Sequence, residues 1–220
     1  MAGKMVFTSD SHFGDEHIVE VERGGKFRDI ADHDAYILSL WKRWIEQLGD
    51  GDTFYFLGDF CKTGLERIYA DAVWRILCPS KCRKVVVFGN HDSPECRELL
   101  GGMFDEVYSY PTYLSNRLVV SHLPCATYPG QVNVHGHTHG MDIGDGRHVC
   151  ASIHVAKYRP ITNSEVDRCM HSSGKWCKRF LYEPWAKDYH MTQRRDDVVY
   201  DVDGRIDLSA SRALAALMRP

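Results

Sequence analysis

The chain has 220 residues, of which 44% are hydrophobic and 26% are charged, and its formal net charge is −3. This length and composition fit one globular domain with a substantial core, with room for a small appendage. The nearly neutral charge gives no sign of wholesale nucleic-acid binding. No apolar run approaches the roughly 20 residues that a membrane span needs, and no signal peptide is evident, so we expect a cytoplasmic protein without membrane partners.

The first half of the chain alternates predicted strands and helices. Short apolar runs at Met5–Thr8, Thr53–Leu57 and Val85–Phe88 predict three buried strands. Apolar positions from Ile37 to Leu48 recur with helical spacing. A second helical pattern runs from about residue 63 to 78. This β-α-β-α-β order predicts a parallel sheet with right-handed crossovers.

Local signals suggest where these two helices begin. Asp32 is the expected N-cap of the first, and Thr63 with Glu66 forms an expected capping box for the second. The stretch from Gly14 to Arg28 is rich in polar residues and glycine, and we expect it to be a loop.

The second half is richer in short strands. Residues 106–114 and 117–121 predict a hairpin, residues 131–135 and 149–155 predict further strands, and we expect mostly antiparallel pairing. Two packed sheets flanked by helices, an α/β fold, fit this order best. We expect residues 1–168 to form the main domain and residues 169–220 to form an extension that packs on it.

The eight cysteines show no CxxC spacing. Reduced and mostly buried thiols are the expected state in a chain of this length without a secretion signal. A structural zinc site that uses Cys78 and Cys82 is the alternative, but it lacks a second pair of ligands.

Polar side chains gather at the ends of the predicted strands, where an open α/β sheet builds its sites. All offer nitrogen or oxygen donors, a set that suits Mn, Fe, Zn, Co or Ni and is larger than one ion needs. In both Asp-x-His and His-x-His, alternation in an extended segment would place the two side chains on one face. The residues are Asp10, His12, Asp59, Asn90, His91, Asp92, His122, His137 and His139.

These blocks, in this order, resemble the signature of the calcineurin-like metallophosphoesterases over residues 5–166. Two further segments, Thr8–Gly14 and Tyr158-x-Pro160-Ile161, are similar to a small bacterial and phage-encoded subgroup. The resemblance implies a four-layer α/β/β/α sandwich of two mixed β-sheets flanked by helices. It makes residues 1–168 a catalytic domain.

The resemblance also implies a role for each residue. One divalent ion would be held by Asp10, His12, Asp59 and His139, and the other by Asp59, Asn90, His122 and His137. Asp59 and a hydroxide would bridge the two ions, for which Mn²⁺ is the leading candidate. His91 would protonate the leaving oxygen, and Asp92 would orient His91. Two ions about 3.5–4 Å apart can activate water and stabilise an in-line phosphoryl transfer.

Substrate contacts are less defined. Lys62 and His17 stand where the family pattern has other residues; each could contact substrate or be an ordinary loop residue. His135 could support a ligand or simply pack in the core.

The leading functional hypothesis is hydrolysis of phosphomonoesters or phosphodiesters, with a phosphorylated small molecule or nucleotide as substrate. The alternatives are a nucleotide or nucleic-acid phosphodiesterase and a non-catalytic scaffold with this fold. Between Lys157 and Arg195 there are nine basic against four acidic residues, which mildly favours an anionic substrate.

Overall fold

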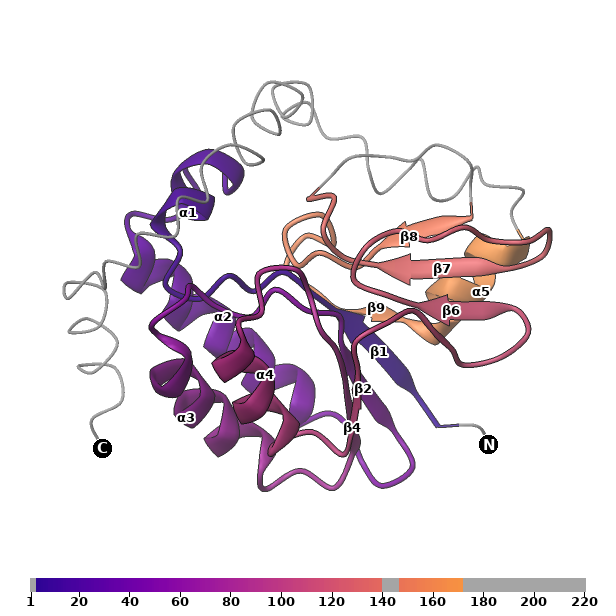
Figure 1. Cartoon of the computed structure of the whole chain (residues 1–220), viewed down its shortest axis with the longest axis horizontal. Helices are drawn as coiled ribbons and strands as arrows, with labels where there is room; N and C mark the ends of the chain where they lie inside the picture. Colours follow the sequence, from indigo (N-terminus) through magenta and orange to yellow (C-terminus); the bar gives the residue numbers. More distant parts are fainter. Residues whose placement is uncertain (1–2, 140–146, 172–220) are drawn as a thin grey trace.

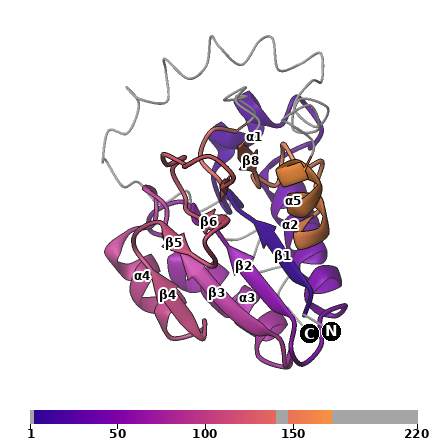
Figure 2. The same cartoon turned by 90° about the vertical axis from the view of Figure 1, so that its right-hand side faces the viewer.

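Two β-sheets packed face to face, with helices outside them, form the body of the computed structural model, which describes residues 3–139 and 147–171 (Figures 1 and 2). The first sheet has the order β4-β3-β2-β1-β9. Its strands are β1 (Met5–Thr8), β2 (Thr53–Phe56), β3 (Arg83–Val87), β4 (Glu106–Tyr108) and β9 (Ile161–Thr162). The first four pair in parallel and β9 pairs antiparallel to β1, so the predicted parallel β1-β2-β3 arrangement is confirmed.

The strands of the first sheet are apolar on both faces because both faces are covered. Along β1, for example, Val6 packs in the core beneath the helices, whereas its neighbour Phe7 packs in the core between the two sheets. The helical side is covered by α2 (Ile30–Ile45), α3 (Glu66–Leu77) and α4 (Pro94–Gly101), with Trp41 of α2 fully buried at its centre (Figure 1).

Several helix boundaries differ from the prediction. The expected polar loop contains α1 (Glu16–Glu22), which begins because the Asp15 carboxylate accepts hydrogen bonds from the amides of His17 and Ile18. Helix α2 begins earlier than expected, with Asp29 rather than Asp32 as its N-cap. Helix α4 was not predicted, although Ser93 and Pro94 are ordinary helix-start residues.

The predicted capping box at α3 is wrong. The residue that precedes α3 is Leu65, and it makes no side-chain cap. The Glu66 carboxylate accepts hydrogen bonds from the Gly64 amide and the Ser93 hydroxyl instead. Glu66 therefore ties the start of α3 to the segment that leads into α4.

The second sheet has the order β5-β6-β7-β8. Its strands are β5 (Thr112–Tyr113), β6 (Leu118–Val120), β7 (Val132–His135) and β8 (His148–Cys150). Only β5 and β6 pair antiparallel; β6-β7 and β7-β8 are parallel, so the expected antiparallel second half is wrong. Only the β5-β6 part of the predicted hairpin forms, because residues 106–108 join the first sheet as β4.

The sandwich of two mixed sheets flanked by helices is confirmed. Within the described residues, the helix beside the second sheet is α5 (Asn163–His171), which lies against β7 and β9. The proposed extension over residues 169–220 lies almost wholly outside the described residues. No helix in the described part of the chain is long and apolar enough to span a membrane.

The two sheets meet at the carboxyl ends of their strands. The amide of Ser9, just past β1, donates to the Ala151 carbonyl, and the Ile153 amide donates back to the Ser9 carbonyl. This short parallel bridge joins the end of β1 to the segment after β8. Side chains that follow strands of either sheet are thereby brought to one place.

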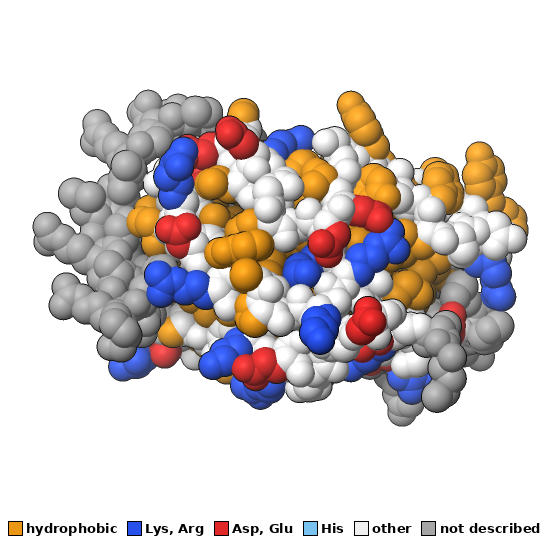
Figure 3. Space-filling view, turned by 90° about the horizontal axis from the view of Figure 1, so that it is seen from below, with side chains coloured by type: hydrophobic (Ala, Val, Ile, Leu, Met, Phe, Trp, Pro, Cys, Tyr) orange, Lys and Arg blue, Asp and Glu red, His pale blue; other side chains and the backbone are white. Residues whose placement is uncertain are grey.

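The opposite end of the first sheet has a different character. Figure 3 shows acidic and basic side chains mingled there with hydrophobic ones. A hollow of about 460 Å³ lies where β2 and β3 begin, lined by residues that include Asp52, Lys84 and Asp105. Lys84 pairs with Asp105 at 3.5 Å, so its charge is already partnered. The strand-end residues of the sequence analysis are all at the other edge.

Six cysteines of the described residues are free thiols, and four of these six are buried. Cys78 is exposed and Cys82 is buried, and neither belongs to a group that could bind metal in the described part of the chain.

Candidate metal centre

Left-handed backbone conformations mark the loops that carry the candidate ligands. Outside glycine such φ angles are uncommon and cost about 1–3 kcal/mol each, and they gather at functional sites. The pairs Asp10/His12 and His137/His139 are therefore not extended segments, contrary to the prediction. The non-glycine residues of the site with positive φ are Asp10 (57°), His12 (45°), Asp59 (58°), His137 (65°) and His139 (41°).

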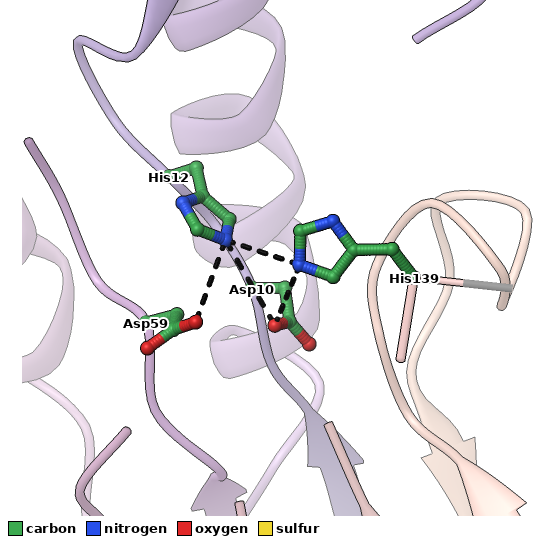
Figure 4. A group of neighbouring side chains, drawn as sticks. All are labelled: Asp10, His12, Asp59 and His139. Atoms are coloured by element: carbon green, nitrogen blue, oxygen red, sulfur yellow. Dashed lines mark hydrogen bonds and ion pairs between the residues drawn. The ribbon is translucent and has the colours of Figure 1, made fainter. Parts of the chain in front are cut away.

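The first group of potential ligands consists of Asp10, His12, Asp59 and His139, all buried (Figure 4). Their ligand atoms lie within 4.8 Å of one another. The Nε2 atoms of His12 and His139 are 3.2 Å apart, and Figure 4 shows the two rings approaching from different loops with the carboxylates beside them. This is the first metal set that the sequence predicts.

The second group consists of Asp59, His122 and His137, again with ligand atoms within 4.8 Å. The Asn90 side chain joins it, since its Oδ1 lies 2.9 Å from His122 Nε2. His122 Nδ1 lies 2.7 Å from the Leu57 carbonyl, which fixes the ring and leaves Nε2 facing Asp59 and Asn90. Ligand histidines commonly use their second nitrogen in this way.

Asp59 belongs to both groups, and one of its oxygens faces a histidine of each. Its Oδ2 lies 3.2 Å from His122 Nε2, 3.6 Å from His12 Nε2 and 3.9 Å from His91 Nε2. None of these is aligned as a hydrogen bond, and Oδ2 is a buried acceptor with no hydrogen-bond partner among the described residues. A buried carboxylate oxygen without a partner is costly unless a cation satisfies it.

The electrostatics of the two carboxylates favour their ionised forms. Burial alone would raise the pKa of Asp59, but the charges of His122, His12 and His91 outweigh it and hold that pKa well below its usual value. Burial acts likewise on Asp10, and His139 lowers the pKa of Asp10 by its charge and by a hydrogen bond to Oδ1 at 3.1 Å.

The pKa values of the histidines shift in different directions because their neighbours differ. Burial would lower the pKa of His122, but Asp59 outweighs it and raises this pKa to about 10. For His139 burial is again outweighed, here by Asp10, so its pKa is raised. Burial keeps the pKa of His12 well below the ordinary value, and burial together with His122 lowers the pKa of His137. The site therefore holds both protonated and neutral imidazoles near neutral pH.

His91 is placed at the edge of the cluster rather than in it. About a quarter of its side chain is exposed, and its ring centroid is 5.7 Å from that of His12. Its backbone amide donates to Asp59 Oδ1 at 3.0 Å. The ring therefore faces the shared carboxylate from the more open side, as a group that meets a substrate should.

The Asp92 carboxylate lies between the loops that follow β2 and β3. Its Oδ2 accepts hydrogen bonds from the amides of Gly89 and Asp59, and its Oδ1 accepts one from Phe60. Asp92 thus joins the loop after β3 to the loop after β2. The orienting of His91 by Asp92 stays a prediction, because the hydrogen bonds of this carboxylate go to backbone amides and to the Cys96 thiol.

Two arginines support the loops and were not found from the sequence. Arg23, only 3% exposed, donates from Nη2 to the carbonyl of Asp10 at 3.0 Å, while its Nε and Nη1 have no hydrogen-bond partner within the described structure. Arg97 of α4 donates to the carbonyls of Gly89 and Asp92. Each arginine stands in a polar stretch of sequence, where a solvated charge is the usual interpretation.

Asp34 is a third supporting residue that the sequence did not single out. It is buried in α2 and accepts hydrogen bonds from the Gly14 amide and the Tyr69 hydroxyl. It thereby anchors the loop after β1 to α2 and α3.

The remaining predicted residues lie around the cluster. His17 is in the first turn of α1, and the amide of Lys62 donates to the Phe13 carbonyl; substrate contacts by either side chain stay predictions. His135 is 1% exposed and lies outside both groups, with its Nδ1 2.7 Å from the Gly136 carbonyl. Burial lowers its pKa to about 4, which fits a neutral packed ring.

The residues present fit divalent metal. The donors are imidazole nitrogens and carboxylate or amide oxygens, the usual set for transition ions. Asp59 Oδ2, which accepts no hydrogen bond within the described residues, faces a histidine of each group. The cluster at the carboxyl ends of the strands can thus bind metal.

Comparison with known proteins agrees with this site. The family model of the calcineurin-like phosphoesterases matches residues 3–199. The gene 66 protein of Mycobacterium phage D29 is 38% identical over 91 residues, which are 40% of this chain and 40% of that protein, so the match spans less than half of its length. The gene 66 protein of Mycobacterium phage L5 is 27% identical over 164 residues, 60% of this chain and 76% of that protein.

A solved structure has the same fold. It is a protein of unknown function from Aquifex aeolicus, 26% identical, with a TM-score of 0.57 over 76% of this chain and 98% of that one. The two phage proteins fit the phage-type subgroup that the sequence resembles. With most of its length matched by the family model, the chain belongs to the calcineurin-like phosphoesterases.

Proposed function

We propose that the protein is a dinuclear metal-dependent phosphoesterase that hydrolyses phosphomonoesters or phosphodiesters. The observation that carries this proposal is Asp59 Oδ2, a buried oxygen that accepts no hydrogen bond among the described residues and faces a histidine of each ligand group. A carboxylate in that position would bridge two ions. The alternative of a non-catalytic scaffold is disfavoured because every predicted ligand is present and brought to one place.

The two ions would be held by residues of both sheets. Asp10, His12, Asp59 and His139 would hold one, and Asp59, Asn90, His122 and His137 the other. Mn²⁺ is our first choice, and Fe, Zn, Co or Ni would also suit nitrogen and oxygen donors. Ions bound there would activate water at neutral pH and neutralise the charge of a phosphoryl group.

The protein's own part is positioning and proton transfer. Asp59 Oδ1 fixes the backbone of His91, and the ring of His91 lies at the open edge of the cluster with Nε2 3.9 Å from Asp59 Oδ2. This position supports a role for His91 as the group that would donate a proton to the leaving oxygen of a bound ester, a step worth about 10²–10⁴-fold. Asp92 binds the amides of Asp59 and Phe60 and so fixes the loop that carries the Asp59 carboxylate.

A phosphorylated small molecule or a nucleotide is the expected substrate. Most of the basic segment Lys157–Arg195 lies outside the described residues, so a preference for nucleotides or nucleic acid stays a prediction. The cytoplasmic setting expected from the sequence likewise stays a prediction.

The test combines metal binding with turnover. The chain is stripped with a chelator and titrated with Mn²⁺, and hydrolysis of para-nitrophenyl phosphate and of its bis-ester is then measured side by side. We expect two ions per chain and turnover of at least one compound. Fewer than one ion per chain, without turnover of either compound, would contradict the proposal.

A further inference from the structure

We propose that Arg97 is a positioning residue for Asn90 and His91: it grips both ends of the four-residue loop that carries them. The loop runs from Gly89 to Asp92, directly after β3, and Arg97 reaches it from the first turns of α4. The inference rests on the proposed function, since it explains how two residues of that site are held.

The Arg97 guanidinium donates hydrogen bonds to two backbone carbonyls at once, as a fork. Arg97 Nη2 donates to the carbonyl of Gly89 at 3.0 Å, and Nε donates to the carbonyl of Asp92 at 2.9 Å. The carbonyls of the residues on either side of the Asn90–His91 pair are therefore bound by one rigid, planar group. A planar guanidinium has the right geometry to bond two acceptors at once, whereas an ammonium is a compact point charge.

The guanidinium is itself fixed in place. Its central carbon lies 5.1 Å from the ring centroid of Phe88, the residue just before the loop, in a cation–π contact. Exposed arginines carry much conformational entropy, but here a ring and two carbonyls hold the group. Arg97 is only half-buried, so this arrangement does not serve to fill the core.

The other side of the same loop is held by Asp92. Its carboxylate accepts from the Gly89 amide at 2.7 Å, which closes the loop on itself, and from the amides of Asp59 and Phe60, which ties the loop to the bridging ligand. Gly89 is thus bound twice, at its carbonyl by Arg97 and at its amide by the Asp92 carboxylate, and the carbonyl of Asp92 is bound by Arg97. Between them only Asn90 and His91 are left to face the site.

The positions of the Asn90 and His91 side chains therefore depend on the hydrogen bonds that Arg97 and Asp92 make to the loop. Asn90 Oδ1 lies 2.9 Å from His122 Nε2, and the His91 amide lies 3.0 Å from Asp59 Oδ1. A displacement of about 1 Å at a reacting group can cost about a hundredfold in rate. Loss of the fork should therefore loosen the second ion, through Asn90, and slow turnover, through His91.

The test compares Arg97→Lys with Arg67→Ala. Lysine keeps the positive charge and a long aliphatic stem but cannot bond both carbonyls as a fork. Arg67 is a matched control because it also contacts α4, through Glu95 at 2.8 Å, yet it is 77% exposed and does not touch the loop. For each protein, Mn²⁺ stoichiometry, the affinity for each ion, kcat and KM for bis-para-nitrophenyl phosphate, and thermal unfolding after chelation are measured.

We expect Arg97→Lys to lower kcat about tenfold to a hundredfold and to weaken the second Mn²⁺ about tenfold, while KM and the unfolding temperature of the chelated protein change little. Arg67→Ala should match the wild type in kcat and in both affinities. The inference is overturned if Arg97→Lys binds both ions and turns over within twofold of the wild type.

The inference and the proposed function can fail separately. If the wild type binds two ions but hydrolyses neither test compound, the proposed activity is wrong, and the second-ion affinity of Arg97→Lys alone decides the role of Arg97. If Arg97→Lys changes only the unfolding temperature, Arg97 supports the fold and is not a positioning residue.

Discussion

Asp59 contacts His91 twice: its Oδ1 accepts a hydrogen bond from the His91 amide at 3.0 Å, and its Oδ2 lies 3.9 Å from Nε2 of the same residue. One carboxylate therefore sets the position of the backbone that carries the proposed acid, and also belongs to both ligand groups. The proposed metal binding and proton donation would therefore be linked through this side chain.

Replacement of Asp59 tests this link. Asp59→Asn keeps the size of the side chain and an acceptor for the His91 amide, but it removes the negative charge that two cations would share. We expect at most one Mn²⁺ per chain and a loss of turnover of at least about 10³-fold, because the charge stabilisation lost amounts to several kcal/mol. Metal analysis and initial rates check this.

A matched control is Asp105→Asn, which removes a half-exposed carboxylate at the opposite end of the sheet. It should leave stoichiometry and turnover unchanged. Two ions bound by Asp59→Asn with wild-type affinity would show that Asp59 is not a bridge.

Replacement of His91 should separate chemistry from metal binding. His91 belongs to neither ligand group, so His91→Gln should keep both ions. Turnover should fall about 10²–10⁴-fold for an alkyl phosphate, whose leaving oxygen needs a proton. The loss should be smaller for a para-nitrophenyl ester, whose leaving group is stable without one. Equal losses for the two substrates would argue against proton donation by His91.

The meeting of three candidate ligands could be predicted from the sequence because their positions follow from topology. Asp10, Asp59 and Asn90 each come just after a strand of one parallel sheet, and parallel strands end at the same edge. The link to the second sheet could not be predicted in this way. It depends on the bridge between Ser9 and the segment after β8, a contact between residues more than 140 positions apart.

The supporting residues could not be predicted from pattern. Arg23 and Arg97 act by donating to backbone carbonyls, and nothing in the identity of Asp10 or Gly89 indicates that its carbonyl needs a donor. The left-handed φ angles of Asp10 and His12 were likewise hidden, since a short Asp-x-His after a strand is equally compatible with extended backbone. Tertiary contacts decide both.

The affinity for the second metal ion should depend on pH, because His122 must lose a proton before it can bind that ion. In the metal-free protein Asp59 raises the pKa of His122 to about 10, so this imidazole is protonated at neutral pH. Its Nδ1 faces the Leu57 carbonyl, and an ion must therefore displace the proton from Nε2. We expect the affinity for the second Mn²⁺ to rise about tenfold per pH unit between about pH 7 and 9, with release of about one proton.

Calorimetric titration in two buffers of different ionisation enthalpy measures this proton directly. The stability of the chelated protein should move the other way: a raised histidine pKa stabilises the fold below about pH 6.5, and this contribution is lost as the pH rises towards 10. His122→Gln should abolish both dependences. A metal affinity that does not change with pH would contradict the assignment of His122 as a ligand.

Close packing of the two ligand loops should make Gly89 irreplaceable. A Cβ atom at Gly89 would lie 2.1 Å from Asp59 Oδ1 and 2.5 Å from the Asp59 amide nitrogen. Neither atom can give way, because both belong to the loop that Asp92 and the His91 amide hold. We expect Gly89→Ala to lower the free energy of unfolding by about 1–3 kcal/mol and to displace Asp59 enough to abolish binding of the second ion.

Gly101→Ala is the control: no atom lies within 4 Å of its added Cβ, and alanine favours the end of α4. That variant should be as stable as the wild type or slightly more so, and denaturant unfolding with Mn²⁺ titration distinguishes the two. Wild-type stability and metal binding in Gly89→Ala would mean that the loops after β2 and β3 are less tightly packed than the structure has them.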